Sequence, residues 1–439
     1  MRQNYITRWI SDAWNIFIYE LRQISMDGGF LIIFFFAGLA YPIIYNLIYR
    51  NGVLEDTPVA VVDDADCAAS RRFIREVDAT REIDIAYKCV NMEEAKGLMQ
   101  RRKVNGIIMF PSDFGEKIEN GETSKLSIYA DMSSFLYYKN LLMGTEFVML
   151  HEINNIQIEH YNESGLTGVE SERLVKAIPY EENLPWNKTF SYSIFLISAM
   201  LLLIIQQVMF YGMCLLAGTQ REENRSLASI PHGMSGLGMG RVVLGRGLAY
   251  WLLFLAIGFY IAYIIPAWFG LPQRGSYWDI LVLLLFYVTD CVFFCQTWSS
   301  LITRRESVFV LLLFISPILL FLTGFSWPTC AFPKFWKWFS YLFPSTFACR
   351  GFINLNTAGG DLSTVREPLL AMTLQTVIYY ALSNLAVFVE NWLIHNREKV
   401  DERKAEVRAR VETRIEDRIE KRTGKRVDLE KILDRPIDE

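Results

Sequence analysis

Residues 190–218 read FSYSIFLISAMLLLIIQQVMFYGMCLLAG and contain no charged side chain. A helix of this length and composition can cross the roughly 30 Å hydrocarbon core of a bilayer. Further uncharged runs occupy residues 30–49, 247–271, 307–333 and 369–389, and a sixth run, 280–302, is interrupted only by Asp290. We therefore predict an α-helical polytopic membrane protein with six transmembrane helices, and a purely soluble fold is excluded.

The overall composition agrees with these runs. The 439 residues are 52% hydrophobic and 21% charged, and their mean hydropathy is +0.19. The net charge of -4 hides an acidic region, because residues 51–187 hold 24 Asp/Glu against 14 Lys/Arg. Placing the N-terminus inside puts nine arginines on the inner flanks of the spans and seven basic residues on the outer flanks, as the positive-inside bias requires. Both termini are therefore predicted to be cytoplasmic.

The chain divides into five predicted parts. Residues 1–27 form an amphipathic helix at the inner membrane interface; packing of this helix on its own chain is the alternative. Residues 28–50 are the first transmembrane helix, and residues 51–187 form an extracytoplasmic α/β domain. Residues 188–394 carry transmembrane helices two to six. Residues 395–439, with 14 basic and 13 acidic side chains, form a charged cytoplasmic helix that is either simply solvated or docks on a partner.

The pattern within residues 51–187 is that of a folded domain. Strands are predicted at 59–62, 83–90, 106–110 and 126–129, and helices at 69–78, 91–102 and about 134–161. His151 and His160 lie nine residues apart on the last helix, on nearly opposed sides, so no metal site is predicted there. Pairing of Cys67 with Cys89, or of Cys330 with Cys349, is left open beside free thiols.

Motifs for covalent chemistry are absent from the sequence. There is no GxxxxGK[ST] phosphate loop, GxGxxG turn, HExxH, GxSxG or clustered Cys/His zinc set, and there are only four His residues. We predict that the chain is not an enzyme and binds no cofactor or metal. The mixed charge of its tail also argues against binding of nucleic acid.

Three features stand out. The charged loop after the second span has a composition typical of a rigid segment that docks on another protein, and a generic hydrophilic turn is the alternative. The key residues of this loop are Arg221, Glu222, Glu223 and Arg225. A segment rich in Pro, Gly and Trp, 328–355, is predicted to re-enter the membrane partly as short interfacial helices. Asp290 is an intramembrane carboxylate, either functional or hydrogen-bonded to polar residues that include Gln206 and Gln207.

The order of these parts resembles the permease subunits of ABC-2 type exporters. The resemblance is carried by Leu322-Thr323-Gly324-Phe325-Ser326-Trp327-Pro328, by Phe332-Pro333 and by Phe343-Pro344-Ser345-Thr346-Phe347. It is supported by residues 58–63, PVAVVD, and 104–114, VNGIIMFPSDF. The resemblance covers residues 1 to about 394 and makes Gly324, Trp327, Pro328, Pro333 and Pro344 markers of the re-entrant segment.

The resemblance implies a partner and a mechanism. The loop 219–246 would be the coupling loop, with Arg221, Glu222, Glu223 and Arg225 contacting a separate nucleotide-binding ATPase that holds ATP and Mg. It also implies a second permease copy or paralogue, a bacterial inner-membrane location, and export of a drug-like or amphiphilic substrate, with or without a periplasmic adaptor. Two other hypotheses remain: a membrane receptor or anchor with a signalling tail, and, more weakly, an intramembrane enzyme that uses Asp290.

Overall fold

The computed structural model describes residues 5–176, 183, 185–187, 191–223, 239–390 and 392. The chain folds into two compact units. One contains the residues up to Ile48 and from Ile194 onward, and the other is Tyr49–Ser193. The structure is mostly helical with one small mixed sheet. The charged residues 395–439 lie outside the described residues, and so does Arg225.

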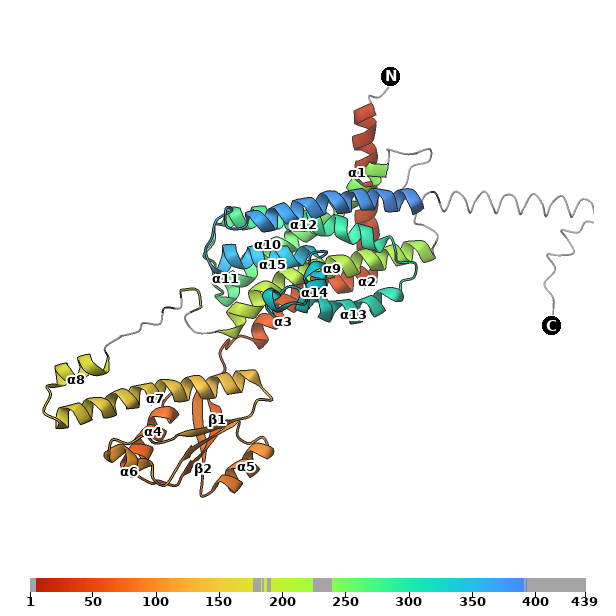
Figure 1. Ribbon diagram of the computed structural model, residues 1–439. Coiled ribbons are helices and arrows are strands. Elements are labelled where there is room, and N and C mark those ends of the chain that lie inside the picture. Colours follow the sequence, from red (N-terminus) through yellow and green to blue (C-terminus); the bar gives the residue numbers. More distant parts are fainter. Residues whose placement is uncertain are drawn as a thin grey trace, which may run out of the picture. The chain divides into compact units, whose positions relative to one another are not determined.

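The first unit is a helical bundle (Figure 1). Five of its helices are long and apolar enough to cross a membrane, counted over the described residues: Gly28–Ile48, Met200–Glu222, Gly240–Phe269, Tyr277–Ser299 and Arg366–Glu390. The first consists of α2 (Gly28–Ile32), a π-helical stretch (Ile33–Ala40) and α3 (Tyr41–Ile48). The second lies in α9 (Tyr192–Glu222), the third joins α10 (Gly240–Phe259), the π-helical Tyr260–Ile264 and α11 (Ile265–Phe269), and the fourth is α12 (Tyr277–Ser299).

The apolar run 307–333 does not form one helix. Its helix, α13 (Ser307–Leu322), has 16 residues, or about 24 Å at 1.5 Å per residue, which is shorter than a typical hydrocarbon core. The chain then turns at Gly324, which has φ +85. The six-span count therefore stays a prediction, with five helices of spanning length observed.

Short helices follow α13. They are the 3-10 turn Thr329–Ala331, α14 (Lys334–Ser340) and α15 (Pro344–Phe352), which continues into the π-helical Ile353–Thr357. Their faces differ strongly, since α14 exposes Phe335 and Trp338 whereas α15 buries Ala348, Cys349 and Phe352. α15 packs on α12 inside the bundle. Short helices are thus observed where the Pro/Gly/Trp pattern predicts them, and partial re-entry into the membrane stays a prediction.

Helix α1 (Tyr5–Met26) crosses the bundle helices and packs on α10 (Figure 1). Ile16 and Phe17 are buried, whereas Ile10, Trp14 and Ile18, spaced one turn apart, stay about half exposed. The crossing is close, because a Cβ built on Gly245 would lie 2.7 Å from the Ala13 carbonyl oxygen. Packing of this helix on its own chain is thus observed, and its location at the inner membrane interface stays a prediction.

The second unit has a four-stranded sheet in the order β2-β1-β3-β4. Its strands are β1 (Thr57–Asp63), β2 (Ile83–Cys89), β3 (Gly106–Phe110) and β4 (Ser127–Ala130), the last antiparallel to β3. One face is covered by α4 (Ala68–Asp78) and α7 (Phe135–Glu163), the other by α5 (Met92–Gln100), and α6 (Phe114–Glu119) and α8 (Gly168–Val175) are shorter. All four predicted strands and all three predicted helices are confirmed. None of the seven cysteines, all of which lie within the described residues, forms a disulfide bond.

Candidate functional site

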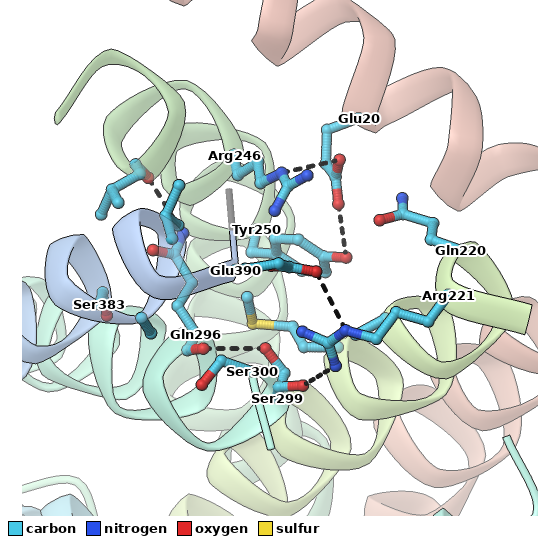
Figure 2. Close-up of a pocket in the computed structure, with 15 residues that line it drawn as sticks. Glu20, Gln220, Arg221, Arg246, Tyr250, Gln296, Ser299, Ser300, Ser383 and Glu390 are labelled. Atoms are coloured by element: carbon cyan, nitrogen blue, oxygen red, sulfur yellow. Dashed lines mark hydrogen bonds and ion pairs between the residues drawn. The ribbon is translucent and has the colours of Figure 1, made fainter. Parts of the chain in front are cut away.

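A polar cavity lies at the end of the bundle where α9 ends and α10 begins (Figure 2). It measures about 50 Å³, which is room for one or two water molecules. Five helices contribute to its walls: Glu20 comes from α1, Gln220 and Arg221 from α9, Arg246 and Tyr250 from α10, Gln296 and Ser299 from α12, and Ser383 and Glu390 from helix Arg366–Glu390. We call this region the α9–α10 end.

Arg221 ties three helices together at the α9–α10 end. Its Nε donates to Glu390 Oε1 at 3.1 Å, and its Nη1 donates to the carbonyl oxygens of Ser299, at 2.9 Å, and Ile302. A guanidinium suits this position, because the last carbonyl groups of a helix lack intrahelical partners and carry partial negative charge. Only 18% of the Arg221 side chain is exposed. Arg221 is thus turned into the bundle and not toward the surface.

The two glutamates that follow Arg221 are exposed at the surface. Glu222 Oε1 accepts a hydrogen bond from the backbone N–H of Arg305 at 2.9 Å, which links the end of α9 to the turn before α13. The helix and turn are in close contact here, since a Cβ on Gly218 would lie 2.8 Å from the Arg305 backbone nitrogen. The start of the loop 219–246 is therefore firmly attached to the bundle.

Three acidic residues from the N-terminal segment meet arginines at this end. Asp12 Oδ2 lies 2.6 Å from Arg241 Nη1. Glu20 accepts a hydrogen bond from the Tyr250 hydroxyl at 3.1 Å and lies 3.9 Å from Arg246. These two acids hold α1 to the first turns of α10, which is the helix that follows the loop.

Asp27 forms the third of these ion pairs. Its Oδ2 lies 3.0 Å from Arg305 Nη1, its Oδ1 accepts from the Phe30 backbone N–H, and Arg305 also donates to Thr219 Oγ1 at 2.7 Å. Asp27 therefore caps the N-terminus of α2 while it binds the turn before α13. Sequence reasoning missed these pairs; the available signal was the spacing of Asp12, Glu20 and Asp27 by eight and seven residues, close to two helical turns.

Glu20 is the most buried of the three acids, at 4% exposure. Burial raises the pKa of its carboxyl above the ordinary value of 4.5, and the opposing effects of Arg246, Tyr250 and Gln220 are smaller. A carboxyl group in this state is sensitive to any movement of α1 against α10. The ion pairs at the α9–α10 end are thus structural ties between the N-terminal segment, α10 and the turn before α13.

The three polar residues singled out within the spans have separate environments. Gln206 is fully buried, and its Oε1 accepts the Ser345 backbone N–H at 2.7 Å, so it caps the N-terminus of α15. Gln207 donates to the Ser316 carbonyl at 3.3 Å. Asp290 is also fully buried, and neither of its oxygens has a hydrogen-bond partner among the described residues. The structure does not bring the three together, and it gives Asp290 no hydrogen bond from either glutamine.

The broken backbone between α14 and α15 is satisfied by side chains. Gln375 Nε2 donates to the Tyr341 carbonyl at 2.7 Å, and the Tyr379 hydroxyl donates to the Leu342 carbonyl at 2.6 Å. Irregular backbone at membrane depth is tolerated only where such partners exist. Both donors lie on helix Arg366–Glu390 and were missed from the sequence, because a donor to a carbonyl has no sequence signature.

The five residues predicted as markers of this segment lie at its turns. Gly324 takes the left-handed conformation next to Thr329, and Pro328 and Pro333 precede the 3-10 turn and α14. Pro344 is the first residue of α15, where a missing N–H has no cost. Trp327 is 59% exposed. The three prolines thus lie at the starts of short helices, and Gly324 lies in the turn after α13.

Comparison with known protein families identifies the family of this chain. Residues 29–385 match the family described as ABC-2 family transporter protein. The chain belongs to this family. A search of curated proteins gave no match. The matched range of this ABC-2 transporter includes the second unit and most of the bundle, and it leaves out α1 and the end of helix Arg366–Glu390.

One group in the second unit of the transporter has metal-ligand character. Glu76, His151 and Glu152 place one ligand atom each within 4.8 Å of one another. Arg72 holds both oxygens of Glu152 in a bidentate pair, with the shortest distance 2.7 Å. Because that guanidinium supplies the positive charge that a cation would bring, the group is better described as an ion-paired contact between α4 and α7. His160 lies elsewhere on α7, near Glu163.

Proposed function

We propose that this ABC-2 transporter is the permease subunit of an ATP-binding cassette exporter. In this proposal a separate ATPase subunit holds ATP and Mg and docks on the loop 219–246. The substrate is drug-like or amphiphilic and leaves the cytoplasm or the inner leaflet. The location is the bacterial inner membrane, with both termini cytoplasmic, and a second copy or a paralogue completes the permease.

The observation that carries the proposal is the attachment of both ends of the loop. Arg221 and Glu222 fix the loop's first end to α12, to helix Arg366–Glu390 and to the turn before α13. Arg241 and Arg246 fix the other end to α1. A force applied to the loop would therefore reach several bundle helices together, as rigid-body switching between two arrangements requires.

The exposure of Arg221, Glu222 and Glu223 assigns them different roles in this proposal. Glu222 and Glu223 are exposed at the surface, whereas Arg221 is directed into the bundle. We therefore assign docking to the two glutamates and transmission to Arg221. The chain itself, without a phosphate-binding loop in its sequence, performs no covalent chemistry in this proposal.

Co-purification tests the proposal. The tagged chain is expressed with its genomic neighbours, and ATPase association and substrate-stimulated ATP hydrolysis are measured in nanodiscs. Glu222→Ala with Glu223→Ala should weaken association, whereas Arg221→Ala should keep association and lose stimulation of hydrolysis. Glu116→Ala with Glu119→Ala, two exposed glutamates on α6, is the matched control. Absence of any associated ATPase from the wild type would overturn the proposal and favour the receptor hypothesis.

A further inference from the structure

A groove in the second unit lies beside the carboxyl ends of β1 and β2, between these strands and α4. Its volume is about 430 Å³, within the range of small-molecule sites. Its apolar floor is formed by Val61 and Ile74, and its rim carries Arg71, Arg75 and Lys88. Open α/β sheets bind ligands outside the carboxyl ends of their strands, and this groove lies at the carboxyl ends of β1 and β2.

A β-bulge in β2 directs Lys88 toward this groove. Val59 pairs with Ile85, whereas Val61, two residues later, pairs with Lys88, so the register shifts by one residue. Ile85, Val59 and Val61 all pack in the core under α4. Regular alternation would send Lys88 to the opposite face, and the extra residue returns it to the α4 face. Bulges that re-aim one side chain are common beside binding sites.

The charges of the groove leave two cations unpaired. Arg71 is bound to Asp66 at 2.7 Å, and Asp63 accepts hydrogen bonds from the Ser70 hydroxyl and the Asp66 backbone N–H. In contrast, the side chains of Arg75 and Lys88 form no ion pair or hydrogen bond within the described part of the chain. The groove thus combines an apolar floor with two exposed positive groups that no acid in the described part of the chain pairs with.

We propose that this groove binds a small amphiphile with a single carboxylate. The carboxylate lies between Arg75 and Lys88 and accepts charge-assisted hydrogen bonds from both. The apolar body of the ligand covers Val61 and Ile74. The inference concerns the second unit alone and requires neither an ATPase nor transport, so its failure would leave the proposed function untouched.

Site-resolved lysine labelling tests the proposal with the full chain in nanodiscs. Octanoate is the probe, and acetylation of each lysine is followed by mass spectrometry. Octanoate should slow acetylation of Lys88 several-fold and leave Lys96, an exposed lysine on α5 at the other face of the sheet, unchanged. The neutral analogue octanamide should give no protection, because it cannot replace the carboxylate.

Two variants complete the experiment. Arg75→Gln should raise the octanoate concentration needed for half-protection of Lys88 about tenfold, as expected for loss of one charge-assisted hydrogen bond. Arg101→Gln, an exposed arginine at the end of α5, should leave it unchanged. Equal protection by octanamide, equal slowing at Lys96, or no protection of Lys88 would each overturn the proposal. An acidic peptide that protects Lys88 where octanoate does not would overturn it in favour of a protein partner.

Discussion

The ion pair between Arg221 and Glu390 should be a strong tie at the α9–α10 end. Arg221 Nε and Glu390 Oε1 are 3.1 Å apart, and the two side chains are 18% and 17% exposed. At an effective dielectric constant near 20 the attraction at this distance is about 5 kcal/mol. The cost of removing both charges from water offsets a large part of it. We therefore expect a measured coupling energy of about 2 kcal/mol.

The two single variants should differ in how much they lower the free energy of unfolding. Arg221→Ala leaves Glu390 buried without its partner and removes a donor from two carbonyl groups, so it should cost about 3–5 kcal/mol. Glu390→Gln keeps a hydrogen-bond acceptor for Arg221 and should cost only about 1–2 kcal/mol. Removal of the arginine should thus be the more damaging change.

A double-mutant cycle measures the coupling. The wild type, Arg221→Ala, Glu390→Gln and the double variant are unfolded in mixed micelles, with tryptophan fluorescence as the readout. The exposed pair Arg71–Asp66, with side chains 52% and 85% exposed, is the control and should show a coupling below about 0.5 kcal/mol. A coupling for Arg221 and Glu390 no larger than that of the control would refute the assignment of this pair as a structural tie.

Three further predictions concern the bundle. Gly245→Ala should destabilise the packing of α1 on α10 by about 1–3 kcal/mol, because the new Cβ would lie 2.7 Å from the Ala13 carbonyl oxygen. Gly258→Ala, whose new Cβ would have its nearest contact at 3.5 Å, should be neutral or stabilising in the same unfolding assay. Gln206→Leu should cost about 1–3 kcal/mol by leaving the Ser345 N–H unpaired, and Gln207→Leu, which loses only a 3.3 Å bond, should cost less. Burial raises the folded pKa of Glu20 above 4.5, so the folded state keeps a proton that the unfolded chain loses. The free energy of unfolding should therefore fall as pH rises from 4.5 through the folded pKa. Melting temperatures measured across this range should fall less steeply for Glu20→Gln than for the wild type.

The second unit was the part best predicted from the sequence. Its strands alternate or form short apolar runs between turn residues, and these local patterns are sufficient to place β1 to β4. The bulge in β2 was not predicted. The bulge depends on the pairing of β2 with β1, and no local sequence pattern within either strand indicates a register shift between them.

The spans were predicted in position, and five helices of spanning length are observed in the described part of the chain, so the count of six stays a prediction. An apolar run reports composition, and it does not report where the backbone bends inside the run. In residues 307–333 the helix ends at Leu322, because the chain turns at Gly324 and irregular backbone follows up to α14. At the next break, between α14 and α15, Gln375 and Tyr379 donate hydrogen bonds to the backbone carbonyls of Tyr341 and Leu342, and both donors lie more than 30 residues farther along the chain.

The arginines at the α9–α10 end show the same limit. In the sequence they count only as positive charges that orient the spans. In the structure Arg241, Arg246 and Arg305 each face an acid of the N-terminal segment, more than 200 residues earlier in the chain. Such pairs depend on which helices pack together, so no local spacing predicts the arginine that each acid meets.

Helix Arg366–Glu390 connects the α9–α10 end with the irregular backbone between α14 and α15. Gln375 holds the backbone before α15, and Glu390 holds Arg221 at the end of α9. The two residues are fifteen positions apart on one continuous helix, or about 22 Å. In the proposed exporter, a displacement of the loop that moves Arg221 therefore has a rigid route to the irregular backbone between α14 and α15. Because the hydrogen bonds at that end are directional, tilting the helix would change their geometry, and α14 and α15 would have to move with it.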